Sequence, residues 1–144
     1  MKCFASSLES NNKRRENNMS EVAKLIQKAA KARENSYSPY SNYPVGAALL
    51  GLDGNTYTGT NVENGVNDLS ICAERVALFK AISEGTREFE RIAVVCEDEY
   101  CKPCGACRQA LMEHAPDLEV IMANPEGDYK TIDLKDLLPE TFEL

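Results

Sequence analysis

The sequence has no apolar run close to the roughly 20 residues that a helix needs to cross a bilayer. The chain has 16 basic residues against 23 acidic ones, for a net charge of −7, and its body has no stripe of Lys and Arg. Its one basic cluster, Lys13-Arg14-Arg15, lies in the polar segment of residues 1–18. Nucleic-acid binding needs a basic face that neutralises phosphates, and adhesion to an anionic membrane needs basic residues too. Internal repeats are absent as well. We therefore expect neither a nucleic-acid partner nor a membrane partner.

A secretion signal is also absent, since residues 1–18 contain no apolar segment of the signal-peptide type. The chain has six cysteines. An even number can indicate a disulfide framework, but the chain is not small and three of the cysteines fall within seven residues, at 101, 104 and 107. This pattern favours a cytoplasmic protein in reducing surroundings, with thiols available for a metal.

The length of 144 residues predicts one domain, long enough to bury roughly two-thirds of its unfolded surface. Residues 1–18 are rich in Ser, Asn and charge and offer little to bury, so a disordered or extended leader is expected there. Met19 resembles a second start. We expect the single folded domain to cover residues 19–144.

Hydrophobic periodicity predicts the elements of this domain. Val22, Leu25, Ile26, Ala29 and Ala30 have the spacing of an amphipathic helix, expected from residue 20 to about 35. Strands are expected at 45–50, 56–61, 92–96, 118–123 and 129–132, and further helices at 72–84, 103–115 and 133–138. The order combines a hairpin with βαβ units. It predicts an α/β fold of three α/β/α layers with a mixed five-stranded sheet.

Two short fragments carry the candidate chemistry, Cys72-Ala73-Glu74-Arg75 and Pro103-Cys104-Gly105-Ala106-Cys107. Each is expected to open a helix, where backbone N–H groups favour a thiolate over a thiol. Cys72, Cys104 and Cys107 would fill three positions around one Zn²⁺ per chain and leave the fourth for water. This is the open arrangement of a catalytic zinc site, and zinc can lower the pKa of water from about 15.7 to roughly 7.

Two charged residues fit such a site without binding the metal. Glu74 follows Cys72 by two residues and is expected to move protons at the metal. Three thiolates and one Zn²⁺ sum to a charge of −1, so Arg75 is expected to donate a hydrogen bond to a ligand sulfur.

Each fragment alone has other interpretations. A C-x-x-C pair occurs in structural zinc knuckles and redox pairs, and Cys101-x-x-Cys104-x-x-Cys107 could belong to an iron–sulfur site, which needs a fourth ligand. The two fragments together, about thirty residues apart, are similar to the zinc nucleobase deaminases, with cysteine as first ligand.

From about Ser20 to its end, the chain resembles the small, homotetrameric, three-cysteine cytidine deaminases. The motifs that carry the resemblance are Tyr37-Ser38-Pro39-Tyr40-Ser41, Pro44-Val45-Gly46-Ala47-Ala48, Asn61-Val62-Glu63-Asn64, Cys72-Ala73-Glu74-Arg75, Pro103-Cys104-Gly105-Ala106-Cys107-Arg108-Gln109 and Leu137-Leu138-Pro139. The resemblance implies the cytidine deaminase fold, hydrolytic deamination of cytidine and 2′-deoxycytidine in pyrimidine salvage, and a homotetramer with shared active sites.

It also implies the parts of a nucleoside site. Asn61 and Glu63 match residues that hold the ribose, chiefly its 3′-hydroxyl. Tyr43 takes the place of an aromatic residue, usually Phe, against the pyrimidine, and Ala73 offers backbone groups to the base. Phe142 matches an aromatic residue that reaches a neighbouring subunit's site.

The sequence departs from the family in two places. Gly65, Val66 and Asn67 stand where Ala, any residue and Tyr are usual, and Lys102 replaces a small or hydroxylated residue. The interpretations left beside cytidine deamination are deamination of another aminopyrimidine nucleoside such as blasticidin S, a nucleic-acid editor, and a zinc-stabilised binding module closed by Cys101. Asn67 is the reason for the first, and the acidic net charge disfavours the second.

Overall fold

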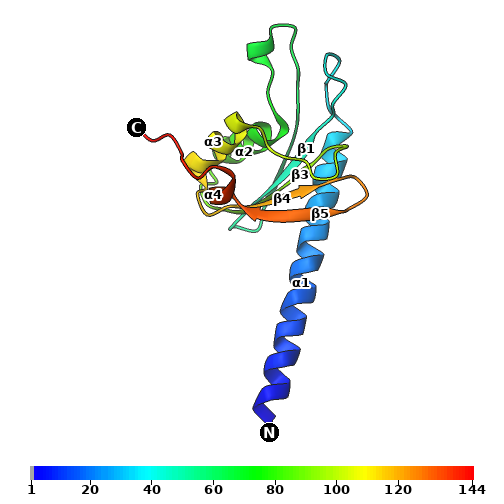
Figure 1. Ribbon diagram of the computed structural model, residues 1–144, viewed down its shortest axis with the longest axis vertical. Helices are drawn as coiled ribbons and strands as arrows, with labels where there is room; N and C mark the ends of the chain where they lie inside the picture. The colour runs from blue at the N-terminus through cyan, green and yellow to red at the C-terminus, as the bar shows by residue number, and fades with distance from the viewer. Residues whose placement is uncertain (1) are drawn as a thin grey trace.

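A five-stranded sheet forms the centre of the computed structural model, which describes residues 2–144 and the side chains from residue 6 onward (Figure 1). The strands are β1 (Gly46–Gly51), β2 (Thr56–Thr60), β3 (Phe89–Val95), β4 (Glu119–Ala123) and β5 (Tyr129–Asp133). Their order is β2-β1-β3-β4-β5; β3 and β4 are parallel, and all other neighbours are antiparallel. The expected mixed sheet is confirmed.

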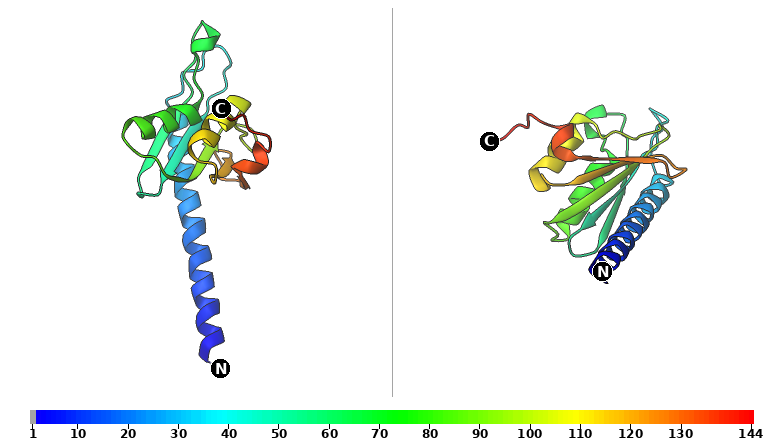
Figure 2. Two further views of the ribbon diagram at one scale, coloured as in Figure 1. Left: turned by 90° about the vertical axis from the view of Figure 1, so that its left-hand side faces the viewer. Right: turned by 60° about the horizontal axis from the view of Figure 1, so that its bottom comes forward.

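Helices cover both faces of this sheet. They are α1 (Lys2–Arg33), α2 (Ala73–Ser83), α3 (Gly105–His114) and α4 (Leu134–Leu137), with a short 3₁₀ helix, η1 (Asn67–Leu69). Figure 2 shows α1 on one face of the sheet and α2 and α3 on the other. The predicted three-layer α/β/α architecture is therefore confirmed.

Each face of the sheet has its own apolar core. The second half of α1 buries the side chains whose periodicity predicted it, among them Val22, Leu25 and Ile26, and these pack against the sheet at Ala48 and Ile121. On the other face, α2 and α3 bury small and aliphatic side chains in a larger cluster. Burial of both sheet faces explains why residues 92–95 of β3 and 120–123 of β4 are continuous apolar runs instead of alternating ones.

The expected leader is helical, which corrects the prediction of a disordered or extended segment. α1 begins at Lys2 and continues without interruption into the docked half of the helix. Composition correctly indicated that residues 6–20 bury nothing, since all of them are exposed. However, this stretch has no Gly or Pro, and a helix already nucleated by packing extends at little cost. The division into a leader and a domain over 19–144 stays a prediction.

No helix in the described chain, α1 included, has the length and apolar character to cross a membrane.

The first turn of α2 lies directly on β2 at a glycine. A Cβ added at Gly59 would lie 2.4 Å from the carbonyl oxygen of Ala73 and 2.6 Å from the backbone nitrogen of Ala77. Only glycine permits so close an approach between helix and strand. This contact fixes the start of α2, where Cys72 and Glu74 lie, against the sheet.

Candidate metal centre and active site

The start of α2 and the start of α3 bring three free cysteines together. Cys72 is the N-cap residue of α2, Cys104 is the N-cap residue of α3, and Cys107 lies buried in the first turn of α3. Their three Sγ atoms all lie within 4.8 Å of one another, and the Sγ atoms of Cys72 and Cys104 are 3.9 Å apart. The structure thus assembles the predicted ligand set.

This donor set fits zinc. Four-coordinate zinc with Zn–S bonds of about 2.3 Å places its sulfurs about 3.8 Å apart, close to the observed separation of Cys72 and Cys104. Arg75 donates from Nη2 to the Sγ of Cys72 at 3.4 Å. The Cys107 thiol, by its hydrogen bond, and the Arg75 guanidinium lower the pKa of Cys72 to about 5. The same hydrogen bond and burial raise the pKa of Cys107, so Cys72 supplies the first thiolate.

Among the residues whose side chains the structure describes, Glu74 is the one Asp or Glu that is buried, with 4% of its surface exposed. It lies in the first turn of α2, and its carboxylate is within hydrogen-bonding reach of the Cys107 thiol. Burial raises the pKa of Glu74 to about 7. A carboxyl that titrates near neutrality can both give and take a proton at the pH of the cell.

A cavity of about 360 Å³ opens beside the thiols. This volume lies within the range of roughly 300–1,000 Å³ found for small-molecule sites. The residues around it are Ser41, Tyr43, Val45, Asn61, Glu63, Cys72, Ala73, Glu74, Cys101, Lys102 and Cys104. A larger hollow near residues 52–57 and 84–88 is open and lies elsewhere. The wall of the cavity beside the thiols contains Cys72, Cys104 and the buried carboxyl of Glu74.

The two residues expected to hold a ribose both line this cavity. Glu63 accepts hydrogen bonds from the backbone N–H groups of Tyr40 and Ser41 at 3.0 and 3.1 Å, and from the Ser41 hydroxyl. Ser41 is the main reason that the pKa of Glu63 is lowered, so the carboxylate stays charged. Asn61 donates to the carbonyl of Tyr43 at 2.8 Å and accepts from the N–H of Val45 at 2.9 Å. Asn61 therefore also fixes the cavity wall.

The other expected substrate contacts divide into two groups. Tyr43 and Ala73 line the cavity, with Ala73 fully buried. Phe142 does not line it: its side chain is 68% exposed, and its backbone is hydrogen-bonded to the side chain of Gln109. A role for Phe142 in a neighbouring subunit's site stays a prediction.

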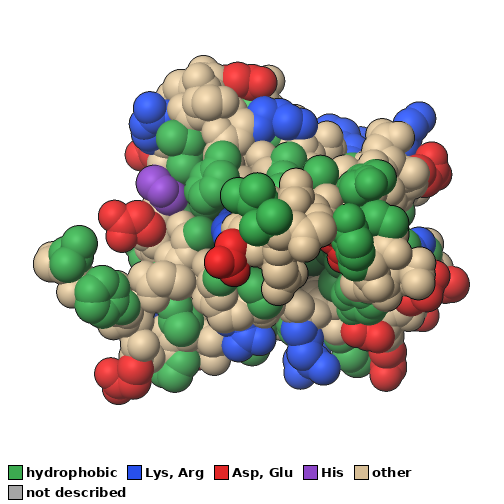
Figure 3. All heavy atoms as spheres, turned by 90° about the horizontal axis from the view of Figure 1, so that it is seen from above, with side chains coloured by type: hydrophobic (Ala, Val, Ile, Leu, Met, Phe, Trp, Pro, Cys, Tyr) green, Lys and Arg blue, Asp and Glu red, His purple; other side chains and the backbone are tan. Residues whose placement is uncertain are grey.

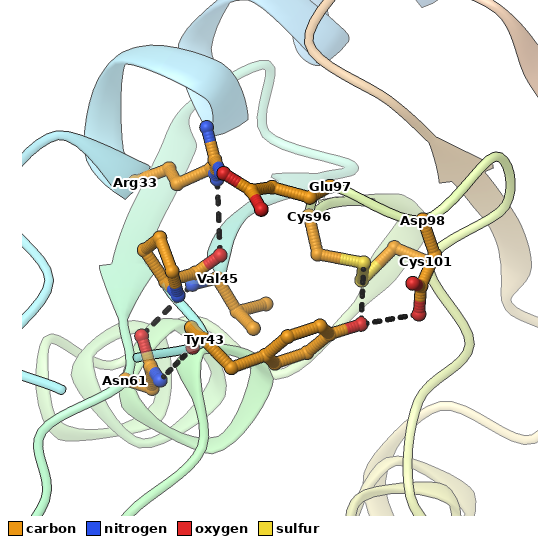
Figure 4. The surroundings of a disulfide bond; sticks show 9 residues. Arg33, Tyr43, Val45, Asn61, Cys96, Glu97, Asp98 and Cys101 are labelled. Carbon is orange, nitrogen blue, oxygen red and sulfur yellow. Dashed lines mark hydrogen bonds and ion pairs between the residues drawn. A yellow bond between two sulfur atoms is a disulfide. The ribbon is translucent and has the colours of Figure 1, made fainter. Parts of the chain in front are cut away.

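The structure pairs Cys96 with Cys101 in a disulfide across five residues, although the cysteine pattern favoured thiols in reducing surroundings (Figure 4). The end of β3 and the loop after it bring the two Cα atoms to 5.3 Å, within the range of disulfides. Sequence alone gave no sign of this turn. The pairing also removes Cys101 as a fourth metal ligand.

We expect a Cys101→Ser variant to retain one zinc per chain, because the metal is held by the three other thiols. Metal analysis of the purified protein measures this. Cys104→Ser is the matched control, with the same substitution three residues away, and should lose most of its zinc. Since Cys101→Ser frees Cys96, the double variant Cys96→Ser/Cys101→Ser is measured beside it. Loss of zinc from the double variant would place Cys101 among the ligands.

Three functional contacts escaped the sequence analysis. Ser41 lines the cavity and holds Glu63. Arg108 donates to the carbonyl oxygens of Pro103 and Leu137 and thereby braces the loop that carries Cys104. Asp98, in the loop after β3, accepts a hydrogen bond from Tyr43. The motif around Cys104 could have indicated Arg108, whereas the contact of Asp98 depends on tertiary structure alone.

Known proteins are similar to this chain in sequence and in fold. Residues 19–123 match the cytidine and deoxycytidylate deaminase zinc-binding region. Cytidine deaminase of Sporosarcina psychrophila is 47% identical, over 85% of this chain and 91% of its own. Cytidine deaminase of Halalkalibacterium halodurans is 49% identical, over 82% and 91%.

Solved structures of cytidine deaminases are similar to this chain as well. A crystal structure of cytidine deaminase from Burkholderia pseudomallei has a TM-score of 0.79 and 50% identity, over 82% of this chain and 96% of that one. For cytidine deaminase from Mycobacterium tuberculosis the TM-score is 0.74 and the identity 38%, over 83% and 95%. The matched region and the thiol cluster confirm the expected zinc cofactor. In sequence, fold and site, the chain belongs to the cytidine deaminase family.

Proposed function

We propose that the protein hydrolyses the exocyclic amino group of cytidine and 2′-deoxycytidine, giving uridine, 2′-deoxyuridine and ammonia. The observation that carries this proposal is the position of Glu74: a buried carboxylate in the wall of a nucleoside-sized cavity, beside three cysteine thiols. The sequence identity of 47% and 49% to two proteins named cytidine deaminase supports the choice of substrate.

In the proposed reaction, Glu74 acts as acid and base in turn. When bound, zinc supplies the nucleophile, because it lowers the pKa of water towards 7. Glu74 places a proton on N3 of the ring, which makes C4 electrophilic. It then carries a proton from the attacking water to the amine, which leaves as ammonia. Arg75 balances the thiolate charge through its hydrogen bond to Cys72.

The sugar and the base are assigned to different residues of the cavity wall. The Glu63 carboxylate, held charged by Ser41, accepts from a ribose hydroxyl, and the Asn61 side chain lies beside it. The Tyr43 ring packs against the pyrimidine, and the Ala73 backbone faces the base. Amide and carboxylate groups are suited to hydroxyl recognition because they offer both donors and acceptors.

The rival interpretations have less support. A binding module closed by a fourth protein ligand needs a free Cys101, which the disulfide consumes. For a nucleic-acid editor, a continuous basic surface would be needed. Over the face in Figure 3, Lys and Arg side chains are scattered and form no continuous patch. A blasticidin S deaminase has the support of Asn67 alone.

Ultraviolet absorbance assays on five compounds test the proposed function. We expect turnover of cytidine and 2′-deoxycytidine, and little with cytosine, cytidine monophosphate or blasticidin S. Turnover of blasticidin S in preference to cytidine would establish that rival. A zinc-loaded protein that turns over none of the five would establish the binding module.

We also propose a homotetramer in which each active site receives residues from a neighbour. Phe142 supports this, because its exposed ring lies outside its own chain's cavity on a short aromatic tail. Light scattering should give a mass near four times that of the 15.9 kDa chain. A stable, fully active monomer would contradict the proposal. We further propose a cytoplasmic location. The three free thiols that the zinc site needs support it, whereas the Cys96–Cys101 disulfide is of a kind that is rare in the cytosol.

A further inference from the structure

The ring of Tyr43 is held at both ends in the cavity wall. At its backbone, the Tyr43 carbonyl accepts a hydrogen bond from the Asn61 side chain at 2.8 Å. At its tip, the hydroxyl donates to Asp98 Oδ2 at 2.6 Å and lies 2.9 Å from the Sγ of Cys96 (Figure 4). The hydroxyl contacts residues that are more than fifty positions away in sequence and do not line the cavity.

The loop that receives the hydroxyl is firmly anchored. It leaves β3 at Cys96, which is fully buried, and returns to Cys101, which is 2% exposed, where the disulfide closes it. Three residues later the same loop supplies the metal ligand Cys104. The hydrogen bond from Tyr43 to Asp98 therefore connects the aromatic wall of the cavity with the loop that leads to the metal.

The phenol keeps its proton throughout the working pH range. Burial, together with the hydrogen bond and the charge of Asp98, raises the pKa of Tyr43 to about 12. A neutral phenol that donates to a carboxylate forms a charge-assisted bond, which is shorter and stronger than one between neutral groups. The observed 2.6 Å agrees with such a bond.

We propose that Asp98 is a positioning residue for the deamination: by holding the Tyr43 hydroxyl, it fixes the aromatic ring against which the pyrimidine packs. This inference rests on the proposed function, because it assigns the ring to the base. Asp98 does not touch the substrate. Asp98 acts by holding the wall of the empty cavity in the shape that binds the substrate. Removal of the Asp98 carboxylate should therefore lower the affinity for the substrate more than the rate of the chemical step.

The test compares Asp98→Ala, Tyr43→Phe and the double variant with the unaltered enzyme. We expect each single variant to raise KM for cytidine by about three- to tenfold, with kcat changed by less than about twofold, because one charge-assisted hydrogen bond at an exposed carboxylate is lost. The double variant should be no worse than Tyr43→Phe, since that variant already lacks the bond that Asp98→Ala removes. Asp98→Asn retains an acceptor oxygen and should recover part of the loss.

Glu99→Gln is the control. Glu99 lies in the same loop and is exposed, and its replacement by Gln removes one negative charge, as Asp98→Ala does. The KM of Glu99→Gln for cytidine should therefore stay within twofold of that of the unaltered enzyme. Zinc content and the unfolding midpoint of every variant are measured as well, to separate positioning from damage to the fold. Additive effects of the two single substitutions, or an unchanged KM in Asp98→Ala, would overturn the inference. If the unaltered enzyme fails to deaminate cytidine, the proposed function fails instead, and the two failures are thereby distinguished.

Discussion

A Glu74→Gln enzyme should keep its zinc and its fold and lose roughly 10²- to 10⁴-fold in kcat, which is the usual contribution of a general acid–base group. The amide has the size and shape of the carboxyl, so it fits the same buried position in the first turn of α2. It cannot pick up and release a proton, and the proposed reaction requires two transfers through this one group. The loss is measured as kcat for cytidine, together with zinc content and the unfolding midpoint.

Glu84→Gln is the matched control for this experiment. Glu84 is the C-cap residue of the same helix and is exposed, so the same substitution there should leave kcat unchanged. If Glu74→Gln retained activity within about tenfold of the unaltered enzyme, the carboxyl would not be the proton carrier and the mechanism would be wrong. Loss of zinc in Glu74→Gln would instead show a structural role at the metal.

Free cytosine should be a far poorer substrate than cytidine, by up to about 10⁴-fold in kcat/KM, since a site built to hydrogen-bond a hydroxyl rejects a compound that lacks it. Without a sugar, Asn61 and Glu63 lose the hydroxyl that they are proposed to bind, and the ring loses the contacts that would orient it in the cavity. 2′-Deoxycytidine should be accepted, because the 3′-hydroxyl is the group proposed to be bound. Comparison of kcat/KM for the three compounds measures this.

Cytidine monophosphate is the fourth compound in this comparison. Cytidine monophosphate should also be a poor substrate, because the Glu63 carboxylate in the cavity wall would repel its phosphate. Lys102 is the one cation among the lining residues that could offset this repulsion. Equal turnover of cytosine and cytidine would exclude ribose recognition by Asn61 and Glu63. Efficient turnover of the monophosphate, abolished in Lys102→Ala, would show that Lys102 has changed the substrate range.

The parts of the site that sequence could predict are those encoded locally. Cys72 and Cys104 each precede a helix, and Glu74 follows Cys72 within the same turn, so the motif contains most of its own geometry. The periodicity of Val22, Leu25 and Ile26 likewise predicted which face of α1 is buried. Local patterns of this kind hold because the elements keep their helical or extended form on packing.

The parts that could not be predicted depend on distances set by the whole fold. Asp98 and Tyr43 are separated by 55 residues, and only the packing of the loop after β3 against the cavity wall brings them together. The Cys96–Cys101 pairing depends on a turn without a sequence signature. The helical form of residues 2–18 was missed for a different reason: composition indicates what a segment can bury, but does not exclude a solvated extension of a docked helix.

The projecting half of α1 affects how the protein moves through a solution. A helix of 32 residues is about 48 Å long, and Figure 1 shows its first half standing clear of the sheet. Such a rod adds friction with little mass, so the chain should diffuse and sediment more slowly than a sphere of equal weight. An assembly of several chains carries several rods, and its gel-filtration volume will correspond to a mass that is too large. Sedimentation equilibrium, which does not depend on friction, gives the number of chains directly.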